Sequence, residues 1–142
     1  MLKTRQKTGK NAAKIRRKLT PRQRFARLRP NERKALLEFV ARLRAQFDDR
    51  IQHVILYGSR ARGRGDAESD LDVLVLANDT NQDLRDEVFR AACDLTLEYG
   101  QAFSAWLNTV QWLERYRDYR LLLYRNIKRD GIELWATTKK LN

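Results

Sequence analysis

The sequence is poor in the residues that mark membrane, secreted or zinc-stabilised proteins. It has one cysteine, Cys93, two prolines and one histidine among 142 residues. A single cysteine forms no internal disulfide and no cysteine-rich zinc site. No apolar run approaches the roughly 18 residues of a membrane-spanning helix, and no apolar signal segment begins the chain. We therefore expect a cytoplasmic protein without a transmembrane helix.

Acidic residues are absent from the first 29 positions, which hold twelve of the 30 lysines and arginines. The other 18 basic residues equal the 18 acidic residues in number, so the net charge of +12 lies wholly in this N-terminal arm. Such an arm either binds nucleic-acid phosphates or acts as a solubilising extension, and both interpretations remain open. The absence of serine and of an apolar stripe disfavours an organelle transit peptide.

The charge distribution divides the chain into a basic arm, residues 1–29, and a domain, residues 30–142. Up to Leu19 the arm has too little apolar surface to offset the entropy of ordering, so we expect disorder there. Thr20 and Pro21 are typical of a helix start and predict a short basic helix that ends near Leu28.

The domain alternates between helical periodicity and short β-rich runs. The predicted elements are, in order, a helix over 31–47, strands over 51–57 and 71–77, a helix over 84–99, a strand over 102–108, helices over 110–116 and 121–129, and a strand over 132–136. This alternation predicts an α/β fold, a small mixed sheet with flanking helices.

Two reactive side chains receive structural interpretations. His53 begins an apolar strand, so we expect a residue at the strand edge and not a catalytic base. Cys93 lies within the periodic helix over 84–99, so we expect a small buried residue. The tryptophans and tyrosines of the last third are expected to pack in the core.

Two polar segments beside the first two strands carry the chemistry. Gly58 and Ser59 follow the first strand directly, and Asp70 and Asp72 begin the second. Because side chains alternate along a strand, both carboxylates face one side, as suits Mg²⁺ that also binds water and substrate phosphates. Gly58 lets the backbone approach a bulky anion, and Ser59 offers a hydroxyl group.

Arg60 and Arg62 lie close enough to Gly58 and Ser59 to neutralise a triphosphate, although solvated loop charges are the alternative. A helical turn beginning at Ser59 would also direct its unpaired amides toward phosphates. Together these residues predict a metal-assisted nucleotidyl transfer site. The alternative for the whole set is a turn beside a solvated acidic loop.

The segments Leu56–Gly63 (LYGSRARG) and Ser69–Val75 (SDLDVLV) resemble the signature of minimal nucleotidyltransferases of the DNA polymerase β-like superfamily. The resemblance implies a polymerase β-like core in which Gly58 and Ser59 hold the triphosphate of ATP or another nucleoside triphosphate. It also implies that Asp70 and Asp72 bind Mg²⁺. Some members are antitoxins that transfer AMP to a HEPN-domain ribonuclease toxin, which implies a protein partner of that kind.

One departure from the family pattern leaves two functions open. Active members usually carry a third carboxylate on the strand after the long helix, and residues 101–108 contain no acid. The first function is transfer of a nucleoside monophosphate, AMP from ATP, to a protein or other hydroxyl acceptor. The second is a catalytically weak nucleotide-binding module that acts as an antitoxin-like or RNA-associated partner.

Overall fold

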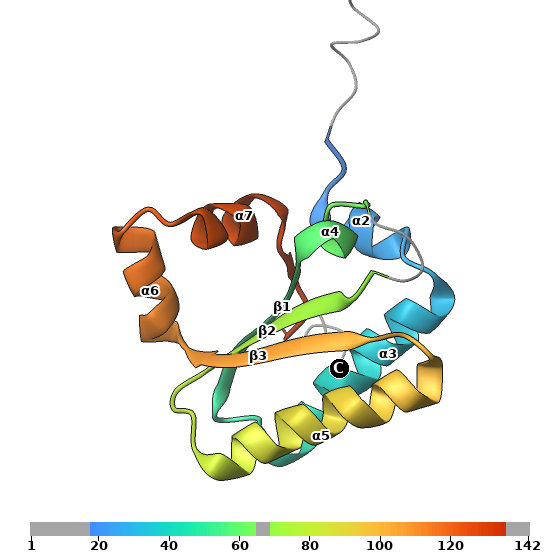
Figure 1. The fold of residues 1–142 in the computed structure, drawn as a ribbon, viewed down its shortest axis with the longest axis horizontal. Coiled ribbons are helices and arrows are strands. Elements are labelled where there is room, and N and C mark those ends of the chain that lie inside the picture. Colours follow the sequence, from blue (N-terminus) through green and yellow to red (C-terminus); the bar gives the residue numbers. More distant parts are fainter. Residues whose placement is uncertain (1–17, 65–68, 136–142) are drawn as a thin grey trace, which may run out of the picture.

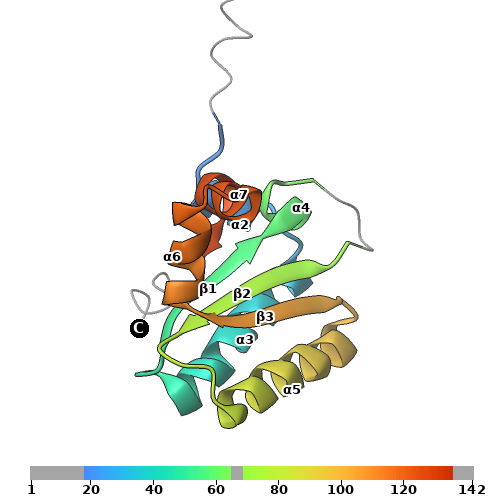
Figure 2. The ribbon, with the colours of Figure 1, turned by 60° about the vertical axis from the view of Figure 1, so that its left-hand side comes forward.

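A computed structural model describes residues 18–64 and 69–135 and shows a four-stranded mixed sheet with helices on both faces (Figure 1, Figure 2). The predicted α/β fold is thus confirmed. The elements are α2 (Pro21–Ala26), α3 (Pro30–Phe47), β1 (Ile51–Tyr57), α4 (Gly58–Ala61), β2 (Leu71–Ala77), α5 (Gln82–Tyr99), β3 (Phe103–Thr109), α6 (Val110–Asp118), α7 (Leu122–Asp130) and β4 (Ile132–Glu133).

The strand order β3-β2-β1-β4 brings three strand ends to one edge of the sheet. β1 is antiparallel to β2 and to β4, whereas β2 and β3 are parallel and are connected through α5. The end of β1 therefore lies beside the starts of β2 and β3. This edge contains both polar segments that the sequence analysis selects.

One face of the sheet packs against α3 and α5 and forms the main core (Figure 1). Helical spacing places Leu36, Phe39, Val40 and Leu43 on the buried side of α3. The ring of Phe39 stacks on Phe103 of β3 at 5.6 Å. The apolar residues that recur at helical spacing therefore form the side of α3 that packs on the sheet.

The opposite face carries a smaller apolar cluster beneath α6 and α7. Leu74 and Leu76 of β2 pack there with Ile127 of α7, because alternate residues of a strand face opposite sides. Trp106 of β3 is 50% exposed, and Tyr119 is 75% exposed. The expectation that all the late aromatic residues enter the core is therefore wrong for these two.

Residues just before α3 pack on the body of the protein. Thr20, at the predicted helix start, is the N-cap residue of α2. Leu28 is buried in the main core. The Arg33 guanidinium donates a hydrogen bond to the Ala26 carbonyl at 2.9 Å, which holds the end of α2. The disorder predicted for the arm falls mainly on residues 1–17, outside the described residues, and the division at residue 29 stays a prediction.

The prediction of a buried Cys93 is wrong, because its thiol is exposed. Ala91, Ala92 and Leu95 form the buried side of α5, whereas Phe89 and Leu97, four residues to either side of Cys93, are exposed. Residues four apart share a helix face, so Cys93 belongs to the outer stripe. In the part of the chain described, no helix is long and apolar enough to cross a membrane.

His53 on β1 lies beside Glu133 of β4, with 2.9 Å between Nδ1 and Oε2. The hydrogen bond to this carboxylate raises the pKa of His53 above 6.5, against the opposing effect of burial. A raised folded-state pKa means that the pair stabilises the fold fully below pH 6.5. That contribution is lost as the pH rises through the folded-state pKa.

We therefore predict that His53→Gln removes a pH-dependent part of the free energy of unfolding. Wild-type stability should fall between about pH 6 and pH 8, near and above the ordinary histidine pKa, more steeply than that of the variant. Urea unfolding across this range measures both, and His53 is the only histidine in the chain. Identical pH profiles would contradict the prediction.

Candidate active site

The register between β1 and β2 brings the two polar segments together. Tyr57, the last residue of β1, lies opposite Asp72 near the start of β2. Gly58 follows Tyr57 with a φ of +76°, and a Cβ atom at Gly58 would overlap Oδ2 of Asp72. The glycine thus serves both a left-handed conformation and a close approach of the backbone to the carboxylate.

The chain leaves β1 as the helical turn α4, which begins at Gly58. The amide of Arg62 donates to the Gly58 carbonyl at 3.3 Å, and that of Arg64 donates to the Ser59 carbonyl at 2.9 Å. Ser59 is half-buried within this turn. The helical turn that would direct amides toward an anion is therefore present.

Asp70 and Asp72 differ in their surroundings, since Asp70 is exposed and Asp72 is half-buried. Burial raises the pKa of Asp72, the charge of Asp70 raises it further, and the charge of Arg62 partly lowers it. The two carboxylates therefore repel each other across a small distance. A bound cation would relieve this repulsion, so the pair fits Mg²⁺, which accepts one or two carboxylate ligands.

A buried glutamine that the sequence analysis missed holds the segment before β2. Gln101, only 6% exposed, donates from Nε2 to the Ser69 carbonyl at 2.8 Å. The amide of Leu71 donates to the Ala102 carbonyl at 2.9 Å. These bonds fix the backbone on either side of Asp70, and nothing in the local sequence distinguishes Gln101 from an ordinary loop residue.

Arg60 takes a position that the sequence analysis did not predict. It is 8% exposed, and its Nε donates to Oε2 of Glu32 in α3 at 3.1 Å. Glu32 itself is 1% exposed, so the ion pair is buried. This pair attaches α4 to α3, and a triphosphate contact by Arg60 stays a prediction.

Arg62 is the arginine that the structure brings near the carboxylates. It is exposed, and its charge acts on both Asp72 and Asp130. No side-chain hydrogen bond or ion pair engages it among residues 18–64 and 69–135. Arg62 is therefore placed where an anion bound beside Asp72 would meet a positive charge.

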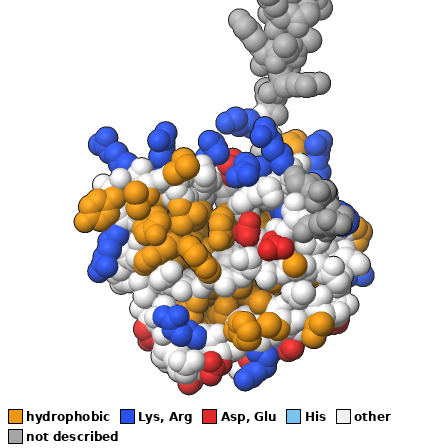
Figure 3. Space-filling view, in the orientation of Figure 1, with side chains coloured by type: hydrophobic (Ala, Val, Ile, Leu, Met, Phe, Trp, Pro, Cys, Tyr) orange, Lys and Arg blue, Asp and Glu red, His pale blue; other side chains and the backbone are white. Residues whose placement is uncertain are grey.

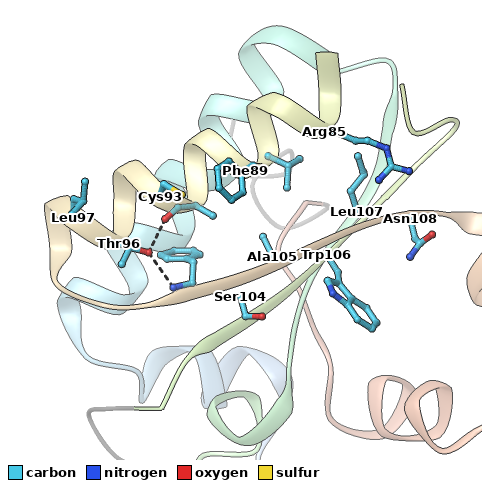
Figure 4. Close-up of a pocket in the computed structure, with 13 residues that line it drawn as sticks. Arg85, Phe89, Cys93, Thr96, Leu97, Ser104, Ala105, Trp106, Leu107 and Asn108 are labelled. Carbon is cyan, nitrogen blue, oxygen red and sulfur yellow. Dashed lines mark hydrogen bonds between the residues drawn. The ribbon is translucent and has the colours of Figure 1, made fainter. Parts of the chain in front are cut away.

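The position next to Asp72 on β3 holds a serine. Ser104 pairs in register with Asp72, and Figure 4 shows that Ser104 and Trp106 point to the opposite side of β3 from Ala105, which faces α5. Ser104 thus lies on the same face as Asp72. Within the described residues, no group of three or more His, Cys, Asp or Glu side chains is arranged to hold a metal ion.

A large groove of about 900 Å³ runs between α5 and β3 (Figure 4). Phe89, Cys93 and Leu97 line it, and none of its lining residues is acidic or belongs to the predicted site. Because nucleotidyl chemistry requires oxygen ligands for a metal, we place the candidate site at Asp70 and Asp72 and not in this groove.

The sequence is also similar to known proteins. Residues 42–140 match the family described as polymerase beta nucleotidyltransferase. A candidate protein adenylyltransferase of Methanocaldococcus jannaschii is 32% identical over 105 residues, which cover 74% of this chain and 99% of the relative. This stretch and the family match both include Gly58, Ser59, Asp70 and Asp72.

Two crystal structures have lower similarity. A variant of the MntA–HpeT toxin–antitoxin has a TM-score of 0.48 and 22% identity, covering 77% of this chain and 73% of that one. A toxin–antitoxin with AMP-PNP has a TM-score of 0.48 and 19% identity, covering 76% of this chain and 84% of that one. Similarity at this level adds nothing to the family match.

We predict that Gly58→Ala destabilises the protein more than Gly63→Ala. Both glycines have a φ of +76°, but an added Cβ meets Asp72 at Gly58 and meets nothing within 4 Å at Gly63. The shared backbone strain costs about 1 kcal/mol. An added Cβ at Gly58 also forces the Asp72 carboxylate to move, which adds to the loss of stability. Urea unfolding compares the variants, and equal losses of stability would contradict the close approach.

We also predict that Glu32→Gln lowers the free energy of unfolding by about 3 kcal/mol, because it removes the buried carboxylate that pairs with the Arg60 guanidinium. The matched control is Glu38→Gln on the same helix, where an exposed carboxylate accepts a hydrogen bond from Tyr99. The control should lose less than about 1 kcal/mol. Comparable losses in the two variants would show that the buried pair has no special structural role.

Proposed function

This chain belongs to the polymerase β nucleotidyltransferase family, and on that premise we propose that it transfers AMP from ATP to a hydroxyl group of a protein. The observation that carries this proposal is the contact between Gly58 and Asp72. It joins a turn suited to a triphosphate with a carboxylate pair suited to its metal ion. Phosphate and metal ligands must be adjacent for transfer of a nucleotidyl group.

The protein acceptor is supported by the Methanocaldococcus jannaschii relative, whose name specifies protein adenylylation and whose whole length is spanned by the match. The name of this relative also supports ATP as the donor, because adenylylation transfers AMP. A HEPN-type toxin as the acceptor remains a prediction from the motif resemblance.

Asp70 and Asp72 would hold Mg²⁺, and the ion would supply positive charge for the phosphate oxygens during transfer. The fit rests on the donor set, which consists of one carboxylate just before β2 and one within it, whose charges repel each other. Water and substrate phosphates complete the coordination of such a site in other proteins. Gly58, Ser59 and Arg62 would bind the triphosphate, with Arg60 acting through the position of α4.

The proposed reaction is an in-line displacement. The acceptor oxygen forms a bond to the α-phosphorus, and the bond from that phosphorus to the oxygen bridging to the β-phosphate breaks. Pyrophosphate leaves with the bridging oxygen, and the acceptor proton passes to water. The chain's own contribution is to orient the triphosphate between α4 and β2 and to hold the α-phosphate beside the carboxylates.

A second function is favoured by Ser104. The position in register with Asp72 holds a hydroxyl group, which cannot ligate a metal as a carboxylate does or accept the acceptor's proton at neutral pH. A chain that lacks this third acid could retain nucleotide binding with weak transfer. It would then act by contact with its partner, as an antitoxin-like or RNA-associated module.

We predict that Asp70→Asn and Asp72→Asn each lower nucleotidyl transfer at least about 10³-fold, because the loss of a metal ligand removes several kcal/mol of charge stabilisation. The assay contains Mg²⁺, α-labelled ATP and the protein encoded beside this one, with incorporation of label as the readout. Asp49→Asn is the control, since Asp49 is an exposed aspartate outside the site.

Nucleotide binding measured in parallel separates the two functions. Label transfer by the wild type and its loss in both site variants would support the transferase. If the wild type binds ATP and Mg²⁺ but transfers no label, the transferase is excluded for that acceptor and the binding module is supported. If the variants bind nucleotide and Mg²⁺ as well as the wild type does, the assignment of Asp70 and Asp72 is wrong.

A further inference from the structure

Five arginines line a pocket of about 320 Å³ beside α4. We call it the arginine pocket, and none of the described residues that line it is acidic. The residues that line it are Leu19, Arg24, Arg27, Leu28, Arg60, Arg62, Gly63 and Arg64. The pocket joins the end of α2 to the turn that follows Gly58 and Ser59, so it adjoins the candidate active site.

Two of the five arginines build the pocket. Arg60 pairs with the buried Glu32. Arg24 donates from Nη1 to the Ala61 carbonyl at 2.6 Å and to the Asp130 carbonyl. Arg24 therefore joins α2 to α4 and α7. Hydrogen bonds and an ion pair thus hold the elements that form the pocket.

The other three arginines, Arg27, Arg62 and Arg64, are exposed. None of the three guanidinium groups makes a side-chain hydrogen bond or ion pair in the described part of the chain. Three like charges around one pocket repel each other, and a bound anion would relieve that repulsion. Guanidinium groups also match phosphate oxygens through paired N–H donors.

The basic surface around the pocket is larger than a single small anion would cover. Figure 3 shows lysine and arginine side chains gathered along the edge formed by α2, α4 and α7. A partner that contacts the whole of this edge must carry several negative charges. A nucleic-acid strand does so, with one phosphate per nucleotide.

We propose that the arginine pocket binds the phosphodiester backbone of a nucleic-acid strand through Arg27 and Arg64, with Arg62 left to the triphosphate. The site lies next to Asp70 and Asp72 but does not require that transfer occurs there. RNA and DNA share this backbone chemistry, so the proposal names the class and the experiment distinguishes the two. Binding is independent of base sequence, because phosphate contacts carry no sequence information.

The test measures the affinity of the full-length protein for fluorescein-labelled 20-nucleotide RNA, single-stranded DNA and duplex DNA by fluorescence anisotropy. The variant is Arg27→Gln/Arg64→Gln, which leaves Arg62 beside Asp72 unchanged. Each phosphate contact to a single strand contributes about 0.7 to the slope of log K against log salt. Loss of two contacts should reduce that slope by about 1.4 and weaken binding about 25-fold at about 0.1 M salt.

The matched control is Arg115→Gln/Arg117→Gln, which removes the same charge from exposed positions of α6. It should change the affinity less than about twofold. Equal effects of the two double variants would overturn the proposal, since only net charge would then matter. Unchanged binding in the pocket variant would overturn it as well.

Two further measurements exclude other ligands. If the pocket variant binds ATP more weakly but nucleic acid normally, the arginines serve the triphosphate and the proposal fails. Tighter binding of a 20-residue polyglutamate than of any nucleic acid would assign the pocket to an acidic protein surface and would also overturn it. Preference among the three nucleic-acid probes then identifies the source of the backbone. None of these outcomes depends on nucleotidyl transfer.

Discussion

The antiparallel pairing of β1 with β2 is the constraint on which the candidate site depends. It places the last residue of β1 opposite Asp72, so the next residue must pass directly against a carboxylate. Only glycine fits there, because Gly58 needs both a positive φ and the space that a Cβ atom would occupy. One register therefore determines the identity of the residue at the turn and the position of the turn beside the acids.

Arginine has two distinct uses around this site. Arg24 and Arg60 are held by carbonyl groups and by Glu32, and they attach α2 and α3 to the turn. Arg62 is left exposed near Asp72. The charges of Arg24 and Arg60 are tolerated inside the protein because each has a specific partner. The exposed charge of Arg62 instead makes the surface attractive to anions. The same residue type thus supplies both the framework and the electrostatic field of the site.

The sequence predicts the sheet and its helices well, because their apolar residues recur at periods of two and of about 3.6 along the chain. The convergence of Gly58 with Asp72 also follows from the motif and from its place at the strand ends. The buried partner of Arg60 could not be predicted, since Glu32 lies 28 residues earlier and a charged side chain gives no sign of its contacts. The prediction for Cys93 is wrong for a different reason, because cysteine is usually buried whereas its spacing from Phe89 and Leu97 places it on the outer stripe of α5.

Glu32 shows that the position of the motif depends on residues outside it. The stretch that identifies the family begins at residue 42, whereas the carboxylate that holds Arg60 in place belongs to the helix before it. Arg24, which reaches the carbonyl at the end of α4, lies earlier still. A transplanted segment of residues 42–140 would carry Gly58, Asp70 and Asp72 without Arg24 and Glu32, which attach α4 to α2 and α3. The geometry of the motif therefore depends on residues that precede the family match in the sequence.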